Sequence, residues 1–401
     1  MNRRTLQGVG AVALVAIGSA LPAHAEPRRW ALALGENRGL ADDPALKYAE
    51  SDARQVLAVL NELGEVDESR AVLVAGADAT KARAALTALE QRLAAEAAPE
   101  DVLLVYLSAH ADEGALHLDG TRLPVAELMT FLERAPVAVA VLMVDSCRSG
   151  ALTRLKGLKP VEGRQVDVVA GALEGRVIIT SSGADEYSQE SDLVQGSFFT
   201  HHLLGGLRGP ADASGDGQVT LDEAYAWAFA HTVESTFATG GGVQQPQVRV
   251  DLRGAGALVL TTPTRSSSRL VLAAAEPGEW LIASIDPNGP VSLVQKPAGP
   301  ASVALPPGRY AVRLRTDDGY RERKVELAAA STLTVAGDEM AGGELVRVAL
   351  KGPVQEARLT AGVGAAMMSG MLSGLPFAAG AEVRLQAPSL VPGALSLALG
   401  F

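Results

Sequence analysis

The only cysteine of this chain lies where a sheet would present a nucleophile. Cys147 follows the apolar run of residues 139–144, inside the polar sequence Asp-Ser-Cys-Arg-Ser-Gly of residues 145–150. A second apolar run, residues 102–107, ends just before His110. A thiolate attacks a carbonyl carbon when a nearby imidazole takes its proton and later protonates the leaving amine. The pattern therefore predicts a cysteine hydrolase with Cys147 as nucleophile and His110 as base.

The same chemistry needs backbone N–H donors for the oxyanion of the tetrahedral intermediate. We expect one donor from the amide of Cys147, at the tip of a strand-to-loop turn, and another from the amide of Ala111. The competing interpretations are a buried cysteine that packs as a small hydrophobe and a histidine without a catalytic role. The positions of Cys147 and His110 after apolar runs favour catalysis. The remaining histidines of the mature chain follow no strand in this way and are expected to be structural or solvated: His117, His201, His202 and His231.

Apolar runs and helical patterns alternate between residues 28 and 260. The expected strands are residues 30–35, 71–74, 102–107, 139–144 and 177–180. The expected helices are residues 48–63, 80–94, 124–132, 198–207 and 221–229, with Thr80 as the N-cap of the second helix. Strands rich in Val, Leu and Ile without polar alternation are buried on both faces, which indicates an α/β fold with a parallel sheet flanked by helices. Sites in such sheets form at the carboxyl ends of the strands, where we expect His110 and Cys147.

The pattern changes at about residue 262 to short alternating strands separated by turn residues. This is typical of an all-β sandwich. The predicted organisation is a signal peptide over residues 1–25, the α/β domain over 26–262, the sandwich over 263–350 and a C-terminal β-rich segment over 351–401. The role of the last segment is left open, as is any association with a membrane.

The first 25 residues have the features of a secretion signal. Arg3 and Arg4 precede an apolar stretch that is too short to span a membrane, and Ala23-His24-Ala25 is a small-x-small cleavage sequence. The general export route is favoured over the twin-arginine route. We therefore expect an exported protein that is periplasmic, associated with the outer membrane or secreted.

The composition allows a sizeable core and excludes some partners. Of the 401 residues, 48% are hydrophobic and 20% are charged. The net charge of −11 argues against nucleic acid as a partner. A single cysteine cannot form a disulfide within the chain.

The chain resembles the caspase-like cysteine peptidases, and most closely the metacaspase and bacterial caspase-homologue branch. The resemblance extends over residues 28–260, and its most specific part is the block Asp145–Gly150 around the cysteine. Its other matching residues are Leu34-Gly35-x-Asn37, Leu46-x-Tyr48-Ala49-x-x-Asp52-Ala53, Thr80, Tyr106-x-Ser108-x-His110, Gly196-x-Phe198-Phe199-Thr200 and Gly206-Leu207-Arg208-Gly209. It implies a caspase-like, mostly parallel sheet and hydrolysis of peptide bonds by His110 and Cys147.

The resemblance also implies which residues bind the side chain that precedes the cut. The positions that match this pocket are Asp52, Ser108 and Asp145. A pair of carboxylates favours Arg or Lys, and Arg can make a bidentate contact. Caspases that cut after aspartate carry a Gln two residues before the cysteine, where this chain has Asp145. We therefore expect protein or peptide substrates with basic residues; the alternative for Asp52 is a carboxylate on a helix surface.

One departure from the family pattern supports a second function. The family usually has glycine on both sides of the histidine, whereas this chain has Ala109 and Ala111. If the backbone there needed a positive φ, alanine would be strained and the oxyanion geometry would suffer. The alternative function is a catalytically inactive caspase-fold scaffold or binding protein. For the active form, the basic residues between residues 150 and 175 suggest self-cleavage in that loop.

A second motif predicts a calcium site. Residues 212–223 fit the twelve-residue EF-hand loop, in which Ca²⁺ takes several hard oxygen ligands and a glycine at the sixth position, here Gly217, allows the turn. The predicted ligands are Asp212, Ser214, Asp216, Gln218, Thr220 and Glu223. The alternative is an Asp- and Gly-rich turn before an N-capped helix. The peptidase chemistry itself requires no cofactor.

Overall fold

The computed structural model describes residues 27–344 except for 113, 147–172, 184–185, 193, 238, 240–241, 274–275, 287–288, 297 and 317–318, and three further strands between residues 360 and 397. The predicted signal peptide lies outside the described residues. So do Cys147 and most of the loop in which self-cleavage is predicted.

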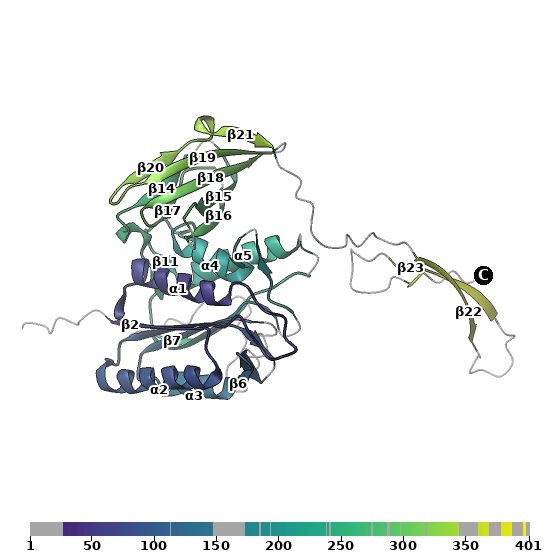
Figure 1. Ribbon diagram of the computed structural model, residues 1–401, viewed down its shortest axis with the longest axis horizontal. Helices are drawn as coiled ribbons and strands as arrows, with labels where there is room; N and C mark the ends of the chain where they lie inside the picture. Colours follow the sequence, from purple (N-terminus) through teal and green to yellow (C-terminus); the bar gives the residue numbers. More distant parts are fainter. Residues whose placement is uncertain are drawn as a thin grey trace, which may run out of the picture.

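A six-stranded sheet forms the centre of the first part of the chain (Figure 1). In spatial order its strands are β12 (Gln247–Arg253), β8 (Glu174–Thr180), β7 (Val139–Asp145), β3 (Val102–Ser108), β1 (Arg29–Gly35) and β2 (Val66–Ala75). All neighbours pair in parallel except β12, which runs antiparallel to β8. The strands β3 and β7 are buried along their whole length, as their unbroken apolar runs predict.

Helices cover both faces of this sheet. Figure 1 shows α2 (Ala79–Glu96) and α3 (Val125–Arg134) on one face, and α1 (Ala49–Leu63), α4 (Phe198–Leu207) and α5 (Leu221–Phe237) on the other. Two hydrophobic clusters lie between the sheet and these helix layers. The expected caspase-like, mostly parallel sheet flanked by helices is confirmed.

Short strands complete this part of the chain. They form the sheets β4–β5–β6 (His110–Ala111, Ala115–Leu118 and Thr121–Pro124), β9–β10 (Glu190–Ser191 and Gly196–Ser197) and β11–β13 (Val219–Thr220 and Val259–Thr261). The sequence pattern did not predict them. Each strand is two to four residues long, which is too short to show a periodicity.

The predicted N-cap of α2 is wrong. The helix begins at Ala79, and its N-cap is Asp78, whose side chain accepts a hydrogen bond from the Lys81 N–H. Asp78 has the extended backbone of a capping residue, with φ −69° and ψ 170°. Thr80 is therefore already inside the first helical turn. The predicted end of α5 is also wrong, because the helix continues to Phe237 and not only to residue 229.

A β-sandwich follows the α/β part, as expected. One sheet contains β17 (Ala301–Ala304), β14 (Arg269–Leu272) and β20 (Thr332–Val335). The other contains β16 (Val291–Lys296), β15 (Gly278–Ser284), β18 (Gly308–Thr316), β19 (Gly319–Leu327) and β21 (Ala341–Glu344). Inward side chains of both sheets share one core, with Leu270 and Trp280 fully buried. The strand predicted at residues 345–350 lies outside the described residues.

The sandwich rests on the layer of α4 and α5 (Figure 1). The Arg208 guanidinium, at the end of α4, donates to Glu62 and to the Ala304 carbonyl, both at 3.0 Å. Trp227 of α5 packs against the cores of both parts. The C-terminal strands β22 (Thr360–Met368), β23 (Ala378–Gln386) and β24 (Ser396–Leu397) form a separate antiparallel sheet. Among the described residues, no helix has the length and apolar character needed to cross a membrane.

Candidate active site

Four of the predicted site residues line one small cavity at the carboxyl ends of the central strands. Its volume is about 30 Å³, and its walls include Asp52, Ser108, His110, Asp145 and Ser146. Ser108 and Asp145 are register partners at the ends of β3 and β7. Parallel pairing therefore places these strand ends side by side. Cys147 follows Ser146 directly in the chain but lies outside the described residues.

The ring of His110 is oriented by a backbone carbonyl. Its Nε2 lies 2.6 Å from the carbonyl oxygen of Pro44, and the side chain is half-buried. A carbonyl oxygen only accepts hydrogen bonds, so Nε2 carries the proton. The neutral ring then has its lone pair on Nδ1, which can take a proton from a thiol.

The two alanines beside the histidine are not strained. The described non-glycine residues with positive φ are Glu65, Asp119, Gln195 and Ala330, so Ala109 and Ala111 adopt ordinary backbone conformations. The Asp112 N–H donates to the Ala115 carbonyl, and Ala111 pairs with Leu116 at the next position of the antiparallel ladder. Because ladder bonds alternate in such a pair, the Ala111 N–H is directed away from β5.

The carboxylate of Asp145 is held by three hydroxyl groups. Ser188 Oγ donates to Oδ1 at 2.5 Å, while Thr200 Oγ1, at 2.6 Å, and Ser197 Oγ donate to Oδ2. Tyr106 Oη lies 2.6 Å from Thr200 Oγ1 and donates to it, because the Thr200 proton goes to the carboxylate. Asp145 is 4% exposed, and these donors replace the water that burial removes.

Asp52 is also buried and faces the same cavity from α1. It is 2% exposed, so the interpretation of Asp52 as a helix-surface carboxylate is wrong. Its Oδ2 accepts a hydrogen bond of 3.1 Å from the Ser197 N–H. Burial, and then the charge of Asp145, raise the pKa of Asp52 well above its usual range. The cavity therefore contains two carboxyl groups that interact with each other.

Comparison with known proteins identifies the family. A family model described as the caspase domain matches residues 28–254, more than half of the chain. The chain belongs to the caspase family. It is therefore a cysteine-type peptidase, and its substrates are proteins or peptides.

Two solved structures with caspase domains are similar to this chain. Caspase-1 from Spodoptera frugiperda is 13% identical, with a TM-score of 0.43, and the match covers 59% of this chain and 90% of that chain. A structure described as pro-sf-caspase-1 is 14% identical, with a TM-score of 0.41 and coverage of 58% and 94%. A search of curated proteins found no match.

Several residues of this caspase site were missed at the sequence level. Ser197 and Thr200 lie in the block of residues 196–200, which entered only through the resemblance. Their Ser-x-x-Thr spacing at the start of a helix is typical of an N-cap, and Ser197 is indeed the N-cap of α4. Ser188 and Pro44 have no local signal. They reach the site only because distant segments fold next to it.

The other histidines of the caspase domain are buried or half-buried. His117 is buried between two carboxylates, with Nδ1 2.7 Å from Asp43 Oδ2 and Nε2 3.1 Å from Asp112 Oδ2. Burial favours a higher pKa for Asp43, but hydrogen bonds from the Leu40 N–H and His117 outweigh it and lower the value. His201 and His202 are buried on α4, and the half-buried His231 lies beside His202 with ring centroids 5.6 Å apart.

The predicted calcium loop is closed by its own hydrogen bonds. Asp212 accepts from the N–H groups of Gly215 and Gly217 at 2.7 and 2.8 Å, and Glu223 accepts from those of Ser214 and Thr220, both at 3.0 Å. Gly217 has φ +84°, which fits the glycine position of an EF-hand loop. Within the described residues, no three His, Cys, Asp or Glu side chains form a group that could hold a metal ion. Calcium binding stays a prediction.

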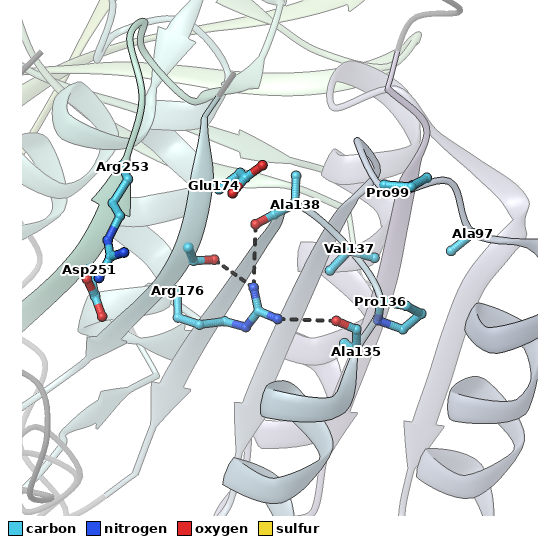
Figure 2. A pocket seen from close by; sticks show the side chains of 11 residues that line it. Ala97, Pro99, Ala135, Pro136, Val137, Ala138, Glu174, Arg176, Asp251 and Arg253 are labelled. Carbon is cyan, nitrogen blue, oxygen red and sulfur yellow. Dashed lines mark hydrogen bonds between the residues drawn. The ribbon is translucent and has the colours of Figure 1, made fainter. Parts of the chain in front are cut away.

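A larger hollow lies at the opposite ends of the strands (Figure 2). Its volume is about 540 Å³, and it contains none of the predicted site residues. The Arg176 guanidinium at its wall donates to the carbonyls of Gly175 at 2.9 Å and Ala135 at 3.2 Å. Arg176 therefore ties β8 to the end of α3, which is a structural task.

Proposed function

We propose that this caspase-family protein is an exported endopeptidase that cuts after Arg or Lys, with Cys147 as nucleophile and His110 as base. The observation that carries the proposal is the presence of two buried carboxyl groups, Asp52 and Asp145, in the cavity that His110 also lines. None of the described residues that line this cavity is Lys or Arg. A basic substrate side chain would supply the missing positive charge.

The proposed reaction follows from the orientation of His110. The Cys147 thiol gives its proton to Nδ1, and the thiolate attacks the scissile carbonyl carbon. The N–H groups of Ala111 and Cys147 donate to the oxyanion, and the imidazolium then protonates the leaving amine. Water hydrolyses the resulting thioester and regenerates the thiol. The direction of the Ala111 N–H, away from β5, supports its part in this sequence.

The inactive scaffold is the weaker alternative. Its motivation was strain at Ala109 and Ala111, and neither residue has a positive φ. A fluorogenic peptide with arginine before the reporter group tests the choice, with wild type compared with Cys147→Ala. We expect turnover in the wild type that Cys147→Ala abolishes. Turnover that is absent from the wild type, with and without Ca²⁺, would support the scaffold.

Export and self-cleavage are further parts of the proposal. The sequence of residues 1–25 supports export, and the amino-terminal sequence of the mature protein tests it, with Glu26 as the expected first residue. The basic residues between 150 and 175 support self-cleavage after one of them. Wild type that stays intact on a gel while it cuts a basic peptide would contradict self-cleavage.

Calcium binding to residues 212–223 is proposed on the chemistry of the donor set. Asp212, Ser214, Asp216, Thr220 and Glu223 offer side-chain oxygens, and Gln218 offers its carbonyl. Calorimetric titration with CaCl₂ tests it, with Asp212→Asn and Glu223→Gln expected to remove any binding signal. A signal that is unchanged in both variants would contradict this site.

A further inference from the structure

Ser197 connects the two carboxyl groups of the cavity. Its backbone N–H donates to Asp52 Oδ2 at 3.1 Å, and its hydroxyl donates to Asp145 Oδ2. The same hydroxyl oxygen accepts the Thr200 N–H at 3.2 Å, as expected of a helix N-cap. The start of α4 therefore fixes both acids relative to each other.

Asp145 accepts hydrogen bonds from more side chains than Asp52 does. Three hydroxyl donors, from Ser188, Ser197 and Thr200, point at Asp145. Two of these donors come from the start of α4 and the third from Ser188, so the Asp145 carboxyl group is held from two segments of the chain. The three hydroxyl groups are fixed in turn by other hydrogen bonds. Ser188 Oγ accepts from Ser181 Oγ, Ser197 Oγ accepts from the Thr200 N–H, and Thr200 Oγ1 accepts from Tyr106 Oη.

Asp52 lines the cavity, and its two carboxyl oxygens have different surroundings. A Cβ atom added to Gly196 would lie 2.9 Å from Asp52 Oδ1, so the glycine keeps this oxygen free of a side-chain contact from position 196. The Ser197 N–H holds the other oxygen, Oδ2. A guanidinium or ammonium group that enters the cavity and contacts Oδ1 would leave the hydrogen bond from the Ser197 N–H to Oδ2 in place.

We propose that Ser188, Ser197 and Thr200 are positioning residues for specificity: they fix the orientation of the Asp145 carboxyl group, and Asp52 Oδ1 is the oxygen that contacts the basic side chain of the substrate. This inference rests on the proposed cleavage after Arg or Lys. It adds a division of roles between the two acids and assigns the residues that enforce it.

The test compares buried hydroxyl groups at the two ends of α4. Thr200→Val and Ser197→Ala each remove one donor to Asp145. The control is Thr261→Val, since Thr261 is fully buried and its hydroxyl donates at 2.7 Å to the Leu207 carbonyl at the far end of the helix. Either variant removes one hydrogen bond to the Asp145 carboxyl group, which is then held less firmly in the pocket. We therefore expect KM for an arginine peptide to rise about tenfold, with kcat little changed. Thr261→Val should lower the melting temperature but leave KM unchanged.

A binding measurement separates this inference from the peptidase proposal. Full-length Cys147→Ala protein is titrated with an acetylated tetrapeptide amide that ends in arginine, and with the same peptide ending in the neutral isostere citrulline. We expect a preference for arginine that falls about tenfold in Thr200→Val, in Ser197→Ala and in Gly196→Ala, which crowds Asp52 Oδ1 without removing a hydroxyl. This result supports the inference even if the wild type cleaves nothing.

Two outcomes would overturn the inference. Equal binding of the arginine and citrulline peptides would remove the basic specificity and the division of roles with it. A preference for arginine that survives in Thr200→Val and Ser197→Ala, or a loss that Thr261→Val reproduces, would leave the specificity standing but show that the hydroxyl groups serve only the stability of α4.

Discussion

The Nε2 atom of His110 lies 2.6 Å from the carbonyl oxygen of Pro44, in the segment between β1 and α1. This segment is itself fixed, because Asp43 binds His117, the cross-strand neighbour of His110. The orientation of His110, the proposed base, therefore depends on the buried His117.

Replacement of His117 should lower turnover rather than substrate binding. His117→Leu releases Asp43 and Asp112, so the Pro44 carbonyl no longer fixes the His110 ring. Small misplacements of a catalytic group reduce rates strongly, and we expect kcat to fall roughly ten- to hundredfold with KM little changed. His231→Leu, which removes a histidine–carboxylate contact on α5, is the control. An unchanged kcat, or a rise in KM alone, would contradict this role.

Replacement of Asp52 should make the folded protein more stable and lower its preference for arginine. The raised pKa of Asp52 means that the folded state binds this proton more tightly than the unfolded chain, so stability falls as pH rises from 3.8 through the folded value. Asp145 and Glu190 are the charged neighbours that add to the effect of burial. Asp52→Asn should therefore melt at a higher temperature at pH 7.

The same variant should lose its preference for arginine. Removal of one partner of a buried charge contact costs about 2–5 kcal/mol, so kcat/KM for an arginine peptide should fall at least roughly thirtyfold. Melting curves and peptide kinetics on one preparation check both effects. A less stable Asp52→Asn protein with unchanged specificity would contradict the proposed contact between Asp52 and the basic side chain of the substrate.

The buried histidines of α4 should make the protein sensitive to acid. Burial lowers the pKa of His201 to about 4, and burial with the neighbouring His201 and His231 lowers that of His202 further from its usual value. The unfolded chain then binds more protons below pH 6.5, so this stability is present at pH 7 and is lost as pH falls toward 4.

The size of this effect can be measured with one variant. For His201 alone the loss between pH 7 and pH 5 is roughly 2 kcal/mol. His201→Gln cannot titrate, so its free energy of unfolding should change less over the same interval than that of the wild type. Urea denaturation at both pH values measures the difference. Equal changes in both proteins would show that His201 does not remain neutral in the folded state.

The contact between the sandwich and the caspase domain should contribute to stability. Arg208→Met breaks the bonds to Glu62 and to the Ala304 carbonyl, and we expect a loss of about 2 kcal/mol because the arginine is buried while Glu62 is partly exposed. Arg309→Met, in an exposed pair with Asp286, should cost less than Arg208→Met, because solvent screens exposed ion pairs. Chemical denaturation compares the two, and equal losses would mean that the junction is not stabilising.

The sequence predicted the strands that end at the site better than it predicted the residues that surround it. Residues 102–107 and 139–144 could be predicted as buried strands because their apolar runs show no alternation, and the resemblance added Asp52, Ser108 and Asp145. Pro44 and Ser188 could not be predicted, since each reaches the site by a contact between segments far apart in the chain. The cap of α2 could not be predicted either, because composition does not show that Asp78, and not Thr80, has the extended backbone of an N-cap.

Labelling by a peptidyl arginyl acyloxymethyl ketone tests the proposed mechanism most directly, because Cys147 is the only thiol in the chain. The mechanism predicts one label, which mass spectrometry places on Cys147, slower labelling in His110→Ala, and little reaction with the aspartyl analogue. A label on another residue, or equal rates with the arginyl and aspartyl reagents, would contradict it.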